Sequence, residues 1–248
     1  MANKKDLNFE TKVIHAGQKS DPTTGAVMTP IVLASTFEQS SPGVHKGYDY
    51  SRSINPTSEA FENCIASLEN GVKGYGFSSG VAAISACIEL LSPGDHVIAM
   101  DDLYGGSVRL FNEIKTISQG IEVSYVDMTN VNNIKADLKE NTKMIFVETP
   151  TNPLLKVADL SKITRLAKAN KILTVCDNTF ASPFNQQPLD HGFDIVIHSA
   201  TKYLGGHSDL IAGAMVIGKK DKKLINRMSN IHNSCLLYTS PSPRDPSI

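Results

Sequence analysis

The sequence predicts an α/β protein with a mostly parallel sheet of about seven strands and helices on both faces. Two observations support this fold class. From Gly74 onward, short apolar runs alternate with helix-length segments, as expected when parallel strands are joined by helical crossovers. Hydrophobic residues make up 41 % of the 248 residues, which provides a sizeable core and excludes a wholly disordered or collagen-like chain.

The elements follow in order along the chain. The first seventy or so residues are rich in Thr, Ser, Pro and Gly, so we expect an irregular segment, with a helix beginning near Thr57. Strands are expected at 74–78, 96–100, 121–126, 143–148, 171–176, 194–199 and 211–218. Helices are expected at 81–91, about 105–117, 132–138 and 160–170. From Ser234 the chain is rich in proline without periodicity, which predicts a disordered tail.

Charge and composition exclude several classes of protein. Lys and Arg number 24 against 25 Asp and Glu, so the charge gives no reason to expect nucleic acid or an anionic membrane as partner. The sequence has neither an apolar run of about 18 residues nor a signal peptide, and we expect a soluble, cytoplasmic protein. The histidines and the four cysteines lack metal-type spacing, so no metal site is predicted.

The candidate site residues follow the apolar runs, because ligands of open parallel sheets bind beyond the carboxyl ends of the strands. Small, hydroxyl, amide and ionisable residues cluster there, at 78–81, 101–106, 148–153, 177–179 and 199–202. Since these strand ends share one edge of the sheet, they predict a single polar site.

Each of these residues taken alone has a structural explanation. Ser79-Gly80 suits a helix cap, Tyr104 a packing residue and Lys202 a solvated surface lysine. Together they form a different set: a helix start that binds phosphate, a flat aromatic ring, the Asp177 carboxylate and a lysine. Pyridoxal phosphate requires these four groups. Neither GxGxxG after the first strand nor GxxxxGK[ST] is present, which disfavours dinucleotide and P-loop proteins.

Several motifs resemble one enzyme family in the same order. They are YSRSINPT, SSGVAA, DDLYGG, ETPTNP, DNTFASP and SATKYLGGHSD. From about residue 9 to 233 the chain resembles the trans-sulfuration, or Cys/Met metabolism, family of pyridoxal-phosphate enzymes. The resemblance implies the aspartate-aminotransferase-like (type I) fold, pyridoxal 5'-phosphate as cofactor and small amino-acid substrates.

The resemblance implies catalytic roles for individual residues. Lys202 would hold the cofactor aldehyde and take the substrate α-proton, while Asp177 would pair with the pyridine nitrogen. Tyr104 would stack on the ring. Tyr104 or Tyr50 would move the proton needed to expel the γ-substituent.

The resemblance also implies binding roles. The phosphate would be held by backbone N–H groups and hydroxyls of Gly80, Val81, Ser199 and Thr201. Tyr50 and Arg52 would reach the phosphate of a neighbouring subunit, so the chain is expected to form a homo-oligomer, a dimer of dimers in relatives. Asn152 would lie beside the cofactor oxygen and the substrate carboxylate, and Glu148 and Arg109 match positions near the site.

The particular reaction follows less directly from the motifs. Methionine γ-lyases commonly have cysteine where this chain has Gly106, which argues against that activity. The motif resembles those of cystathionine γ-synthases and γ-lyases, and we favour γ-replacement on an acylated homoserine by cysteine, with γ-elimination as the alternative, then methionine γ-lyase or homoserine sulfhydrylase. A catalytically inactive α/β scaffold and a nicotinamide-dependent enzyme are the rivals from other classes.

The family continues into a C-terminal domain that carries a carboxylate-binding arginine, and no arginine of this chain matches it. We therefore expect a chain truncated at the C-terminus, with impaired substrate orientation. On this view the chain divides into an N-terminal arm at 1–60, a cofactor-binding domain at 61–233 and a non-native disordered tail at 234–248.

Overall fold

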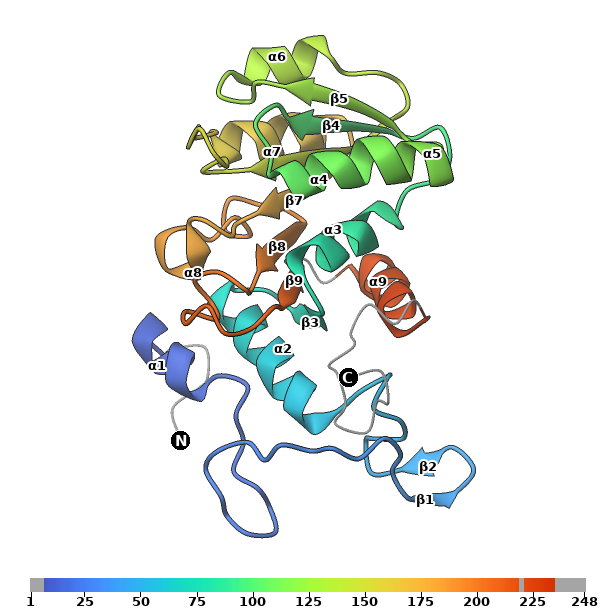
Figure 1. Ribbon diagram of the computed structural model, residues 1–248, viewed down its shortest axis with the longest axis vertical. Helices are drawn as coiled ribbons and strands as arrows, with labels where there is room; N and C mark the ends of the chain where they lie inside the picture. Colours follow the sequence, from blue (N-terminus) through green and yellow to red (C-terminus); the bar gives the residue numbers. More distant parts are fainter. Residues whose placement is uncertain (1–6, 219–220, 235–248) are drawn as a thin grey trace.

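The computed structural model describes residues 7–218 and 221–234. Its central feature is a seven-stranded sheet with the strand order β3-β9-β8-β7-β6-β4-β5 (Figure 1). The strands are β3 Lys73–Phe77, β4 His96–Met100, β5 Glu122–Val126, β6 Thr142–Glu148, β7 Leu173–Asp177, β8 Ile195–Ser199 and β9 Gly213–Ile217. Each corresponds to one of the apolar runs, so the predicted fold class is confirmed.

Most neighbouring strands of this sheet are parallel. β4 pairs in parallel with β5 and β6, and β6–β7 and β7–β8 are parallel as well. β9 lies antiparallel between β3 and β8. The connection 200–212 contains no helix, whereas a parallel connection generally needs a helical crossover, so β9 runs antiparallel to β8. Because β6, β7 and β8 are parallel, their carboxyl ends meet at one edge.

The predicted helices are present. They are α2 Pro56–Leu68, α3 Gly80–Ile88, α6 Val131–Ala136 and α7 Leu160–Ala169. The helix expected at 105–117 is a continuous segment made of α4 Gly105–Arg109, the π-helical η2 Leu110–Lys115 and α5 Thr116–Ser118. Side chains of Asn55, Ser79 and Asp159 accept backbone N–H groups at the starts of α2, α3 and α7. These caps fix where each helix begins.

Sequence reasoning missed several elements. They are α1 Phe9–His15, the hairpin of β1 Gln39–Ser41 and β2 Val44–His45, α8 Ser182–Asn185 and α9 Lys222–Ser234. α9 packs against the sheet through the buried Met228, and its backbone accepts a hydrogen bond from Tyr75 Oη at Ile225 O over 3.1 Å. Ser234 is the last residue of α9, and the rest of the predicted tail lies outside the described residues.

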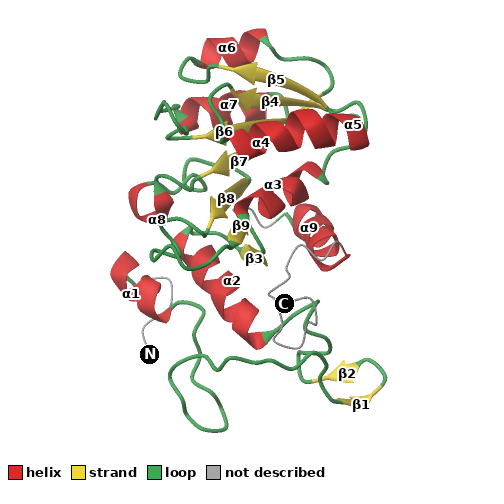
Figure 2. Ribbon diagram, viewed as in Figure 1, coloured by secondary structure: helices red, strands yellow, loops and turns green. Residues whose placement is uncertain are grey.

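The N-terminal segment is mostly loop (Figure 2). α2 begins at Pro56, so the arm boundary expected at residue 60 falls inside this helix. Between α1 and α2 the segment exposes apolar side chains, with Ile31 and Leu33 each 80 % exposed. Exposed apolar groups of this kind commonly mark a contact surface.

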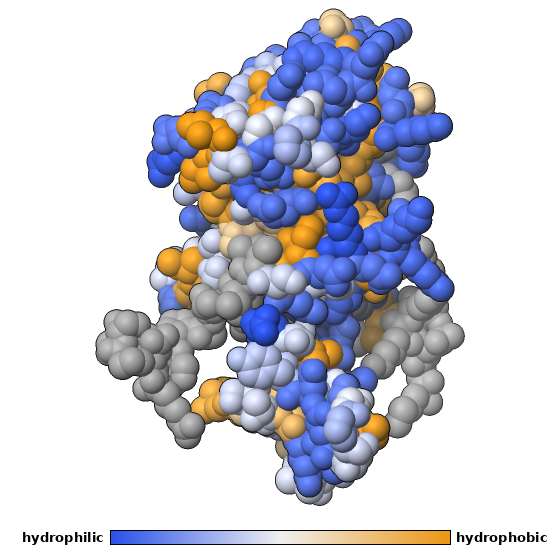
Figure 3. All heavy atoms as spheres, turned by 90° about the vertical axis from the view of Figure 1, so that its right-hand side faces the viewer, coloured by the Kyte–Doolittle hydropathy of each residue, from blue (hydrophilic) through white to orange (hydrophobic). Residues whose placement is uncertain are grey.

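The hydrophobic core lies along the central strands. Met144, Ile145, Phe146 and Val147 of β6 are all fully buried, because helices cover both faces of the sheet. On the face shown in Figure 3, hydrophilic residues cover most of the upper half of the molecule and hydrophobic residues form separate patches. Within the described ranges, no helix is long and apolar enough to cross a membrane.

Candidate functional site

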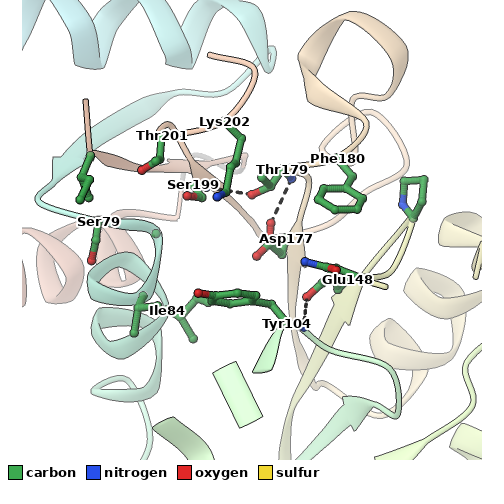
Figure 4. Close-up of a pocket in the computed structure, with 15 residues that line it drawn as sticks. Ser79, Ile84, Tyr104, Glu148, Asp177, Thr179, Phe180, Ser199, Thr201 and Lys202 are labelled. Atoms are coloured by element: carbon green, nitrogen blue, oxygen red, sulfur yellow. Dashed lines mark hydrogen bonds between the residues drawn. The ribbon is translucent and has the colours of Figure 1, made fainter. Parts of the chain in front are cut away.

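A cavity of about 280 Å³ lies at the carboxyl ends of β6, β7 and β8, beside the start of α3 (Figure 4). Nine of the twelve site residues named from the sequence line it. They are Gly80, Val81, Tyr104, Glu148, Asn152, Asp177, Ser199, Thr201 and Lys202. The strand-end residues therefore converge on one site, as the topology of an open parallel sheet requires.

Two carboxyl groups form one wall of the cavity. Glu148 and Asp177 occupy paired positions at the ends of β6 and β7, and they are 5 % and 8 % exposed. Burial, followed by the neighbouring charge of Asp177, raises the pKa of Glu148 to about 8. Burial also raises the pKa of Asp177, while hydrogen bonds from Thr179 and the charge of His198 act in the opposite direction. Both surroundings therefore oppose ionisation, and at Asp177 specific hydrogen bonds and a nearby charge counteract part of that effect.

The start of α3 forms the opposite wall. Ser79 caps the helix by accepting the N–H of Ala82 over 3.1 Å. A Cβ atom on Gly80 would lie 2.8 Å from Ser199 Cβ and 2.9 Å from Ser199 Cα. Only glycine therefore allows the helix start to approach Ser199 this closely. The first N–H groups of a helix have no partner within it, so they are available to an anion next to the Ser199 hydroxyl.

Thr179 connects the two walls. Its backbone N–H donates to Asp177 Oδ1 over 3.0 Å, and its hydroxyl accepts the backbone N–H of Ser199 over 2.8 Å. Thr201, by contrast, donates its hydroxyl to the carbonyl of Ala212 over 3.2 Å. The hydroxyls of Ser199 and Thr201 are both expected to bind phosphate. The Thr201 hydroxyl must first turn its proton away from the Ala212 carbonyl before it can donate to a phosphate.

Lys202 lies on the turn that follows β8. Its backbone N–H donates to Ser199 O over 3.1 Å, which closes this turn. Its side chain points into the cavity toward Ser199 and Thr179 (Figure 4). No ion pair engages Lys202 within residues 7–218 and 221–234. The amine is therefore accessible to a carbonyl group entering the cavity.

The ring of Tyr104 extends across the cavity toward Ile84 (Figure 4). The Tyr104 backbone N–H donates to Glu148 Oε2 over 2.9 Å, which anchors the residue to the end of β6. A Cβ atom on Gly106 would lie 2.4 Å from Tyr104 Cε1, so the ring takes the space that a larger residue at 106 would fill. Tyr104 is 48 % exposed, and its ring presents a flat face to a ligand.

Three residues named from the sequence lie outside this cavity. Tyr50 and Arg52 belong to the N-terminal segment, where the Arg52 guanidinium lies 5.3 Å from the centre of the Tyr50 ring. Arg52 also donates to Asn233 O over 3.1 Å. Arg109 is exposed at the end of α4 and does not line this cavity, so its expected contact with substrate stays a prediction.

Six further residues line the cavity without an individual role predicted from the sequence: Ser79, Ile84, Pro150, Thr179, Phe180 and Ile211. Ser79, Pro150 and Thr179 lie in the strand-end segments that the sequence assigns to the site. Phe180 follows Asp177 within three residues, so its position just after a strand could have predicted that it lines the site. Nothing in the local sequence around Ile84 or Ile211 distinguishes these residues from core positions.

The residues present fit pyridoxal phosphate. The amine of Lys202 suits an aldehyde, the buried carboxyl of Asp177 suits a protonated ring nitrogen, and the ring of Tyr104 suits stacking. The close contact at Gly80 adds helix N–H groups and a hydroxyl, which are the donors that a phosphate needs. Within the described part of the chain, no group of three or more His, Cys, Asp or Glu residues could hold a metal ion.

Comparisons with known proteins agree with this chemistry. A family model described as Cys/Met metabolism PLP-dependent enzyme matches residues 10–243. The chain is 53 % identical to the cystathionine beta-lyase of Coxiella burnetii (strain RSA 493 / Nine Mile phase I), over 96 % of this chain and 62 % of that protein. It is 47 % identical to a probable cystathionine gamma-synthase of Herpetosiphon aurantiacus, over 95 % of this chain and 73 % of that protein.

A solved structure of a related enzyme has the same fold as this chain. The crystal structure of cystathionine gamma-lyase from Lactobacillus plantarum complexed with L-serine superposes with a TM-score of 0.91 and 44 % identity. That match covers 95 % of this chain and 61 % of the other. The chain thus spans roughly three fifths of the length of the Coxiella and Lactobacillus relatives.

Proposed function

The chain belongs to the Cys/Met metabolism PLP-dependent enzyme family, and from this premise we propose that it binds pyridoxal phosphate at Lys202 and acts on the carbon–sulfur bond of cystathionine-type amino acids. The observation that supports the proposal most is the convergence of Lys202, Asp177 and Tyr104 on one cavity beside the start of α3.

The proposed cofactor contacts follow the chemistry of each wall. Lys202 holds the aldehyde carbon, Asp177 holds the ring nitrogen, and Tyr104 covers one face of the ring. The phosphate lies at the start of α3, against Gly80, Val81, Ser199 and Thr201. Asn152 borders the same cavity and is placed to contact the cofactor and the substrate carboxylate.

The protein residues then hold and move protons. Bound pyridoxal phosphate supplies an electron-withdrawing ring that makes the proton on the substrate α-carbon acidic. Lys202 is the group in the cavity that can accept this proton as a neutral amine. Glu148, protonated near neutral pH because of its raised pKa, holds the Tyr104 backbone in place without adding a second negative charge beside Asp177.

Cleavage of cystathionine is the reaction we place first. Its support is the 53 % identity to a cystathionine beta-lyase. γ-Replacement on an acylated homoserine is the second candidate, supported by the DDLYGG motif with Gly106 and by the 47 % identity to a probable cystathionine gamma-synthase.

We further propose that Tyr50 and Arg52 serve a neighbouring subunit. Both lie outside the cavity of their own chain, on a segment whose apolar residues are exposed. Arg52 carries a permanent positive charge, which suits contact with a phosphate. The active unit would then be at least a dimer.

Product analysis of the purified chain tests the function. The chain is incubated with pyridoxal phosphate and cystathionine. Both cleavages take up one water: at the β-carbon the products are homocysteine, pyruvate and ammonia, and at the γ-carbon they are cysteine, 2-oxobutanoate and ammonia. Incubation with an acylated homoserine and cysteine tests γ-replacement, which yields cystathionine and the free acid. We expect products from cystathionine and none from Lys202→Ala. Cofactor binding without any of these products would overturn the substrate assignment.

A further inference from the structure

Glu69 is a buried carboxylate that lies behind the cavity rather than in it. It follows α2 as its C-terminal cap and is 0 % exposed. One of its oxygens, Oε1, accepts the side-chain N–H of Asn178 over 2.8 Å and lies 2.6 Å from Nε2 of His198. Asn178 and His198 are themselves 0 % and 1 % exposed. The three side chains form one buried polar cluster.

This cluster joins the two strand ends that carry the site. Asn178 directly follows Asp177 at the end of β7, and His198 directly precedes Ser199 at the end of β8. Asn178 is fixed on its other side by Gln186, to which it donates over 2.8 Å and from which it accepts over 2.9 Å. A single carboxylate oxygen therefore adds a side-chain link between the two strand ends, which the backbone bond from Asn178 N–H to Ile197 O and the Thr179 hydroxyl already join.

The cluster also sets the charge near Asp177. Glu69, Glu148 and Asp177 are three buried carboxyl groups at this end of the sheet, and a buried charge needs a partner. His198 is that partner for Glu69. The charge of His198 lowers the pKa of Asp177, against the effect of burial.

The pair is not arranged for stability alone. The second oxygen of Glu69, Oε2, is buried and has no hydrogen-bond partner among the described residues. An unsatisfied buried oxygen costs free energy, and a buried ion pair often contributes little to stability. Because stability alone does not explain a buried Glu69 with one oxygen unpartnered in the described part of the chain, its role is expected in the neighbouring cavity, whose residues Asp177 and Ser199 adjoin its two partners.

We propose that Glu69 is a positioning residue for the cofactor ring: through its contacts with Asn178 and His198 it directs Asp177 and Ser199 into the cavity. The inference rests on the proposed binding of pyridoxal phosphate. It assigns a function to a residue that touches neither cofactor nor substrate.

The test compares Glu69→Gln with Glu62→Gln. Glu62 is a second buried glutamate of α2, but it binds the Gly76 N–H and the Lys73 ammonium, away from the ends of β7 and β8. Two readouts are taken: the affinity for pyridoxal phosphate by fluorescence titration, and the protonation of the ring nitrogen by NMR with ¹⁵N-labelled cofactor. Denaturant unfolding of each variant reports the structural contribution separately.

For Glu69→Gln we expect affinity to fall about tenfold, the factor equivalent to one pKa unit, and the ring nitrogen to lose protonation at neutral pH. Glu62→Gln should keep both properties of the wild type, even where its stability is reduced. Wild-type values for both readouts in folded Glu69→Gln would overturn the inference. If Glu69→Gln does not fold, His198→Gln replaces it, since glutamine retains a donor toward Glu69 but carries no positive charge. A wild-type chain that does not bind pyridoxal phosphate would instead contradict the proposed function.

Discussion

Glu148 and Asp177 occupy paired positions at the ends of the adjacent parallel strands β6 and β7, and both carboxyl groups are buried. Two buried acids this close cannot both ionise at low cost. The pKa of Glu148 is raised to about 8, and burial raises the pKa of Asp177 as well, against hydrogen bonds from Thr179 and the charge of His198. Glu148 therefore remains neutral at pH 7 as an anchor for Tyr104.

Glu148→Gln should change how stability depends on pH. The folded state holds a proton on Glu148 up to about pH 8, whereas an unfolded glutamate releases it near 4.5. The folded state therefore binds more protons between these values, and the free energy of unfolding of the cofactor-free wild type should fall by roughly 3 kcal/mol between about pH 5 and pH 8. Glutamine does not titrate, so this fall should be absent in denaturant unfolding of the variant. Parallel curves for wild type and variant would contradict the assignment, and Glu113→Gln on the exposed side of η2 is the control.

Gly106→Ala should weaken cofactor binding. Its Cβ atom would lie 2.4 Å from Tyr104 Cε1, so the ring must leave its place across the cavity. We expect the dissociation constant for pyridoxal phosphate to rise about fivefold, equivalent to about 1 kcal/mol of overpacking. Gly105→Ala is the matched control, because its Cβ atom would meet nothing within 4 Å in the same helix. Equal affinities for the two variants would show that the position of Tyr104 does not depend on Gly106.

Gly80→Ala should destabilise the protein as well as its phosphate site. The new Cβ atom would lie 2.9 Å from Ser199 Cα, which is backbone and cannot rotate away. A loss of about 1–3 kcal/mol in the free energy of unfolding is expected from a contact of this kind. Urea denaturation measures it, with Gly105→Ala again as the control. A variant as stable as the wild type would mean that α3 and Ser199 do not need this close approach.

The buried His96 should make the free energy of unfolding decrease in acid, without affecting the cavity that binds the cofactor. It lies at the amino-terminal end of β4, 0 % exposed, with its ring nitrogens 2.8 Å from Thr142 Oγ1 and Ser124 Oγ. Burial lowers the pKa of His96 below its ordinary 6.5. The unfolded state therefore binds more protons, and stability should decrease as the pH falls below about 6.5.

The variant His96→Asn tests this dependence. Its free energy of unfolding should vary less with pH between about 6.5 and 5 than that of the wild type. Its affinity for pyridoxal phosphate should be unchanged, because the cavity lies at the carboxyl ends of the strands. A change in affinity would contradict the separation of the two ends of the sheet.

The sheet could be predicted from the sequence because its strands are buried on both faces. A run such as MIFV at 144–147 is entirely apolar, and it stands between segments of helical period. The polar residues after each run could be assigned to one site for the same reason, since parallel strands end at the same edge.

Other features depend on contacts that no local pattern contains. His198 meets Glu69 across 129 residues of sequence, and Tyr75 contacts the backbone of α9 across 150. The antiparallel direction of β9 depends on the path of the connection 200–212, which the apolar run at 211–218 does not indicate. Arg109 is placed near the site by its motif, and its position at the exposed end of α4 leaves its contact with substrate a prediction.

The central claim is that Lys202 holds pyridoxal phosphate in this cavity. Borohydride reduction of the chain with pyridoxal phosphate, followed by peptide mass spectrometry, tests it most directly. Condensation of the Lys202 amine with the aldehyde releases water, and hydride from borohydride makes the new carbon–nitrogen bond permanent. We expect one stoichiometric adduct on the peptide that contains Lys202, retained in Lys143→Ala and lost in Lys202→Ala. An adduct that persists at the same yield in Lys202→Ala, or that is spread over several surface lysines, would contradict it.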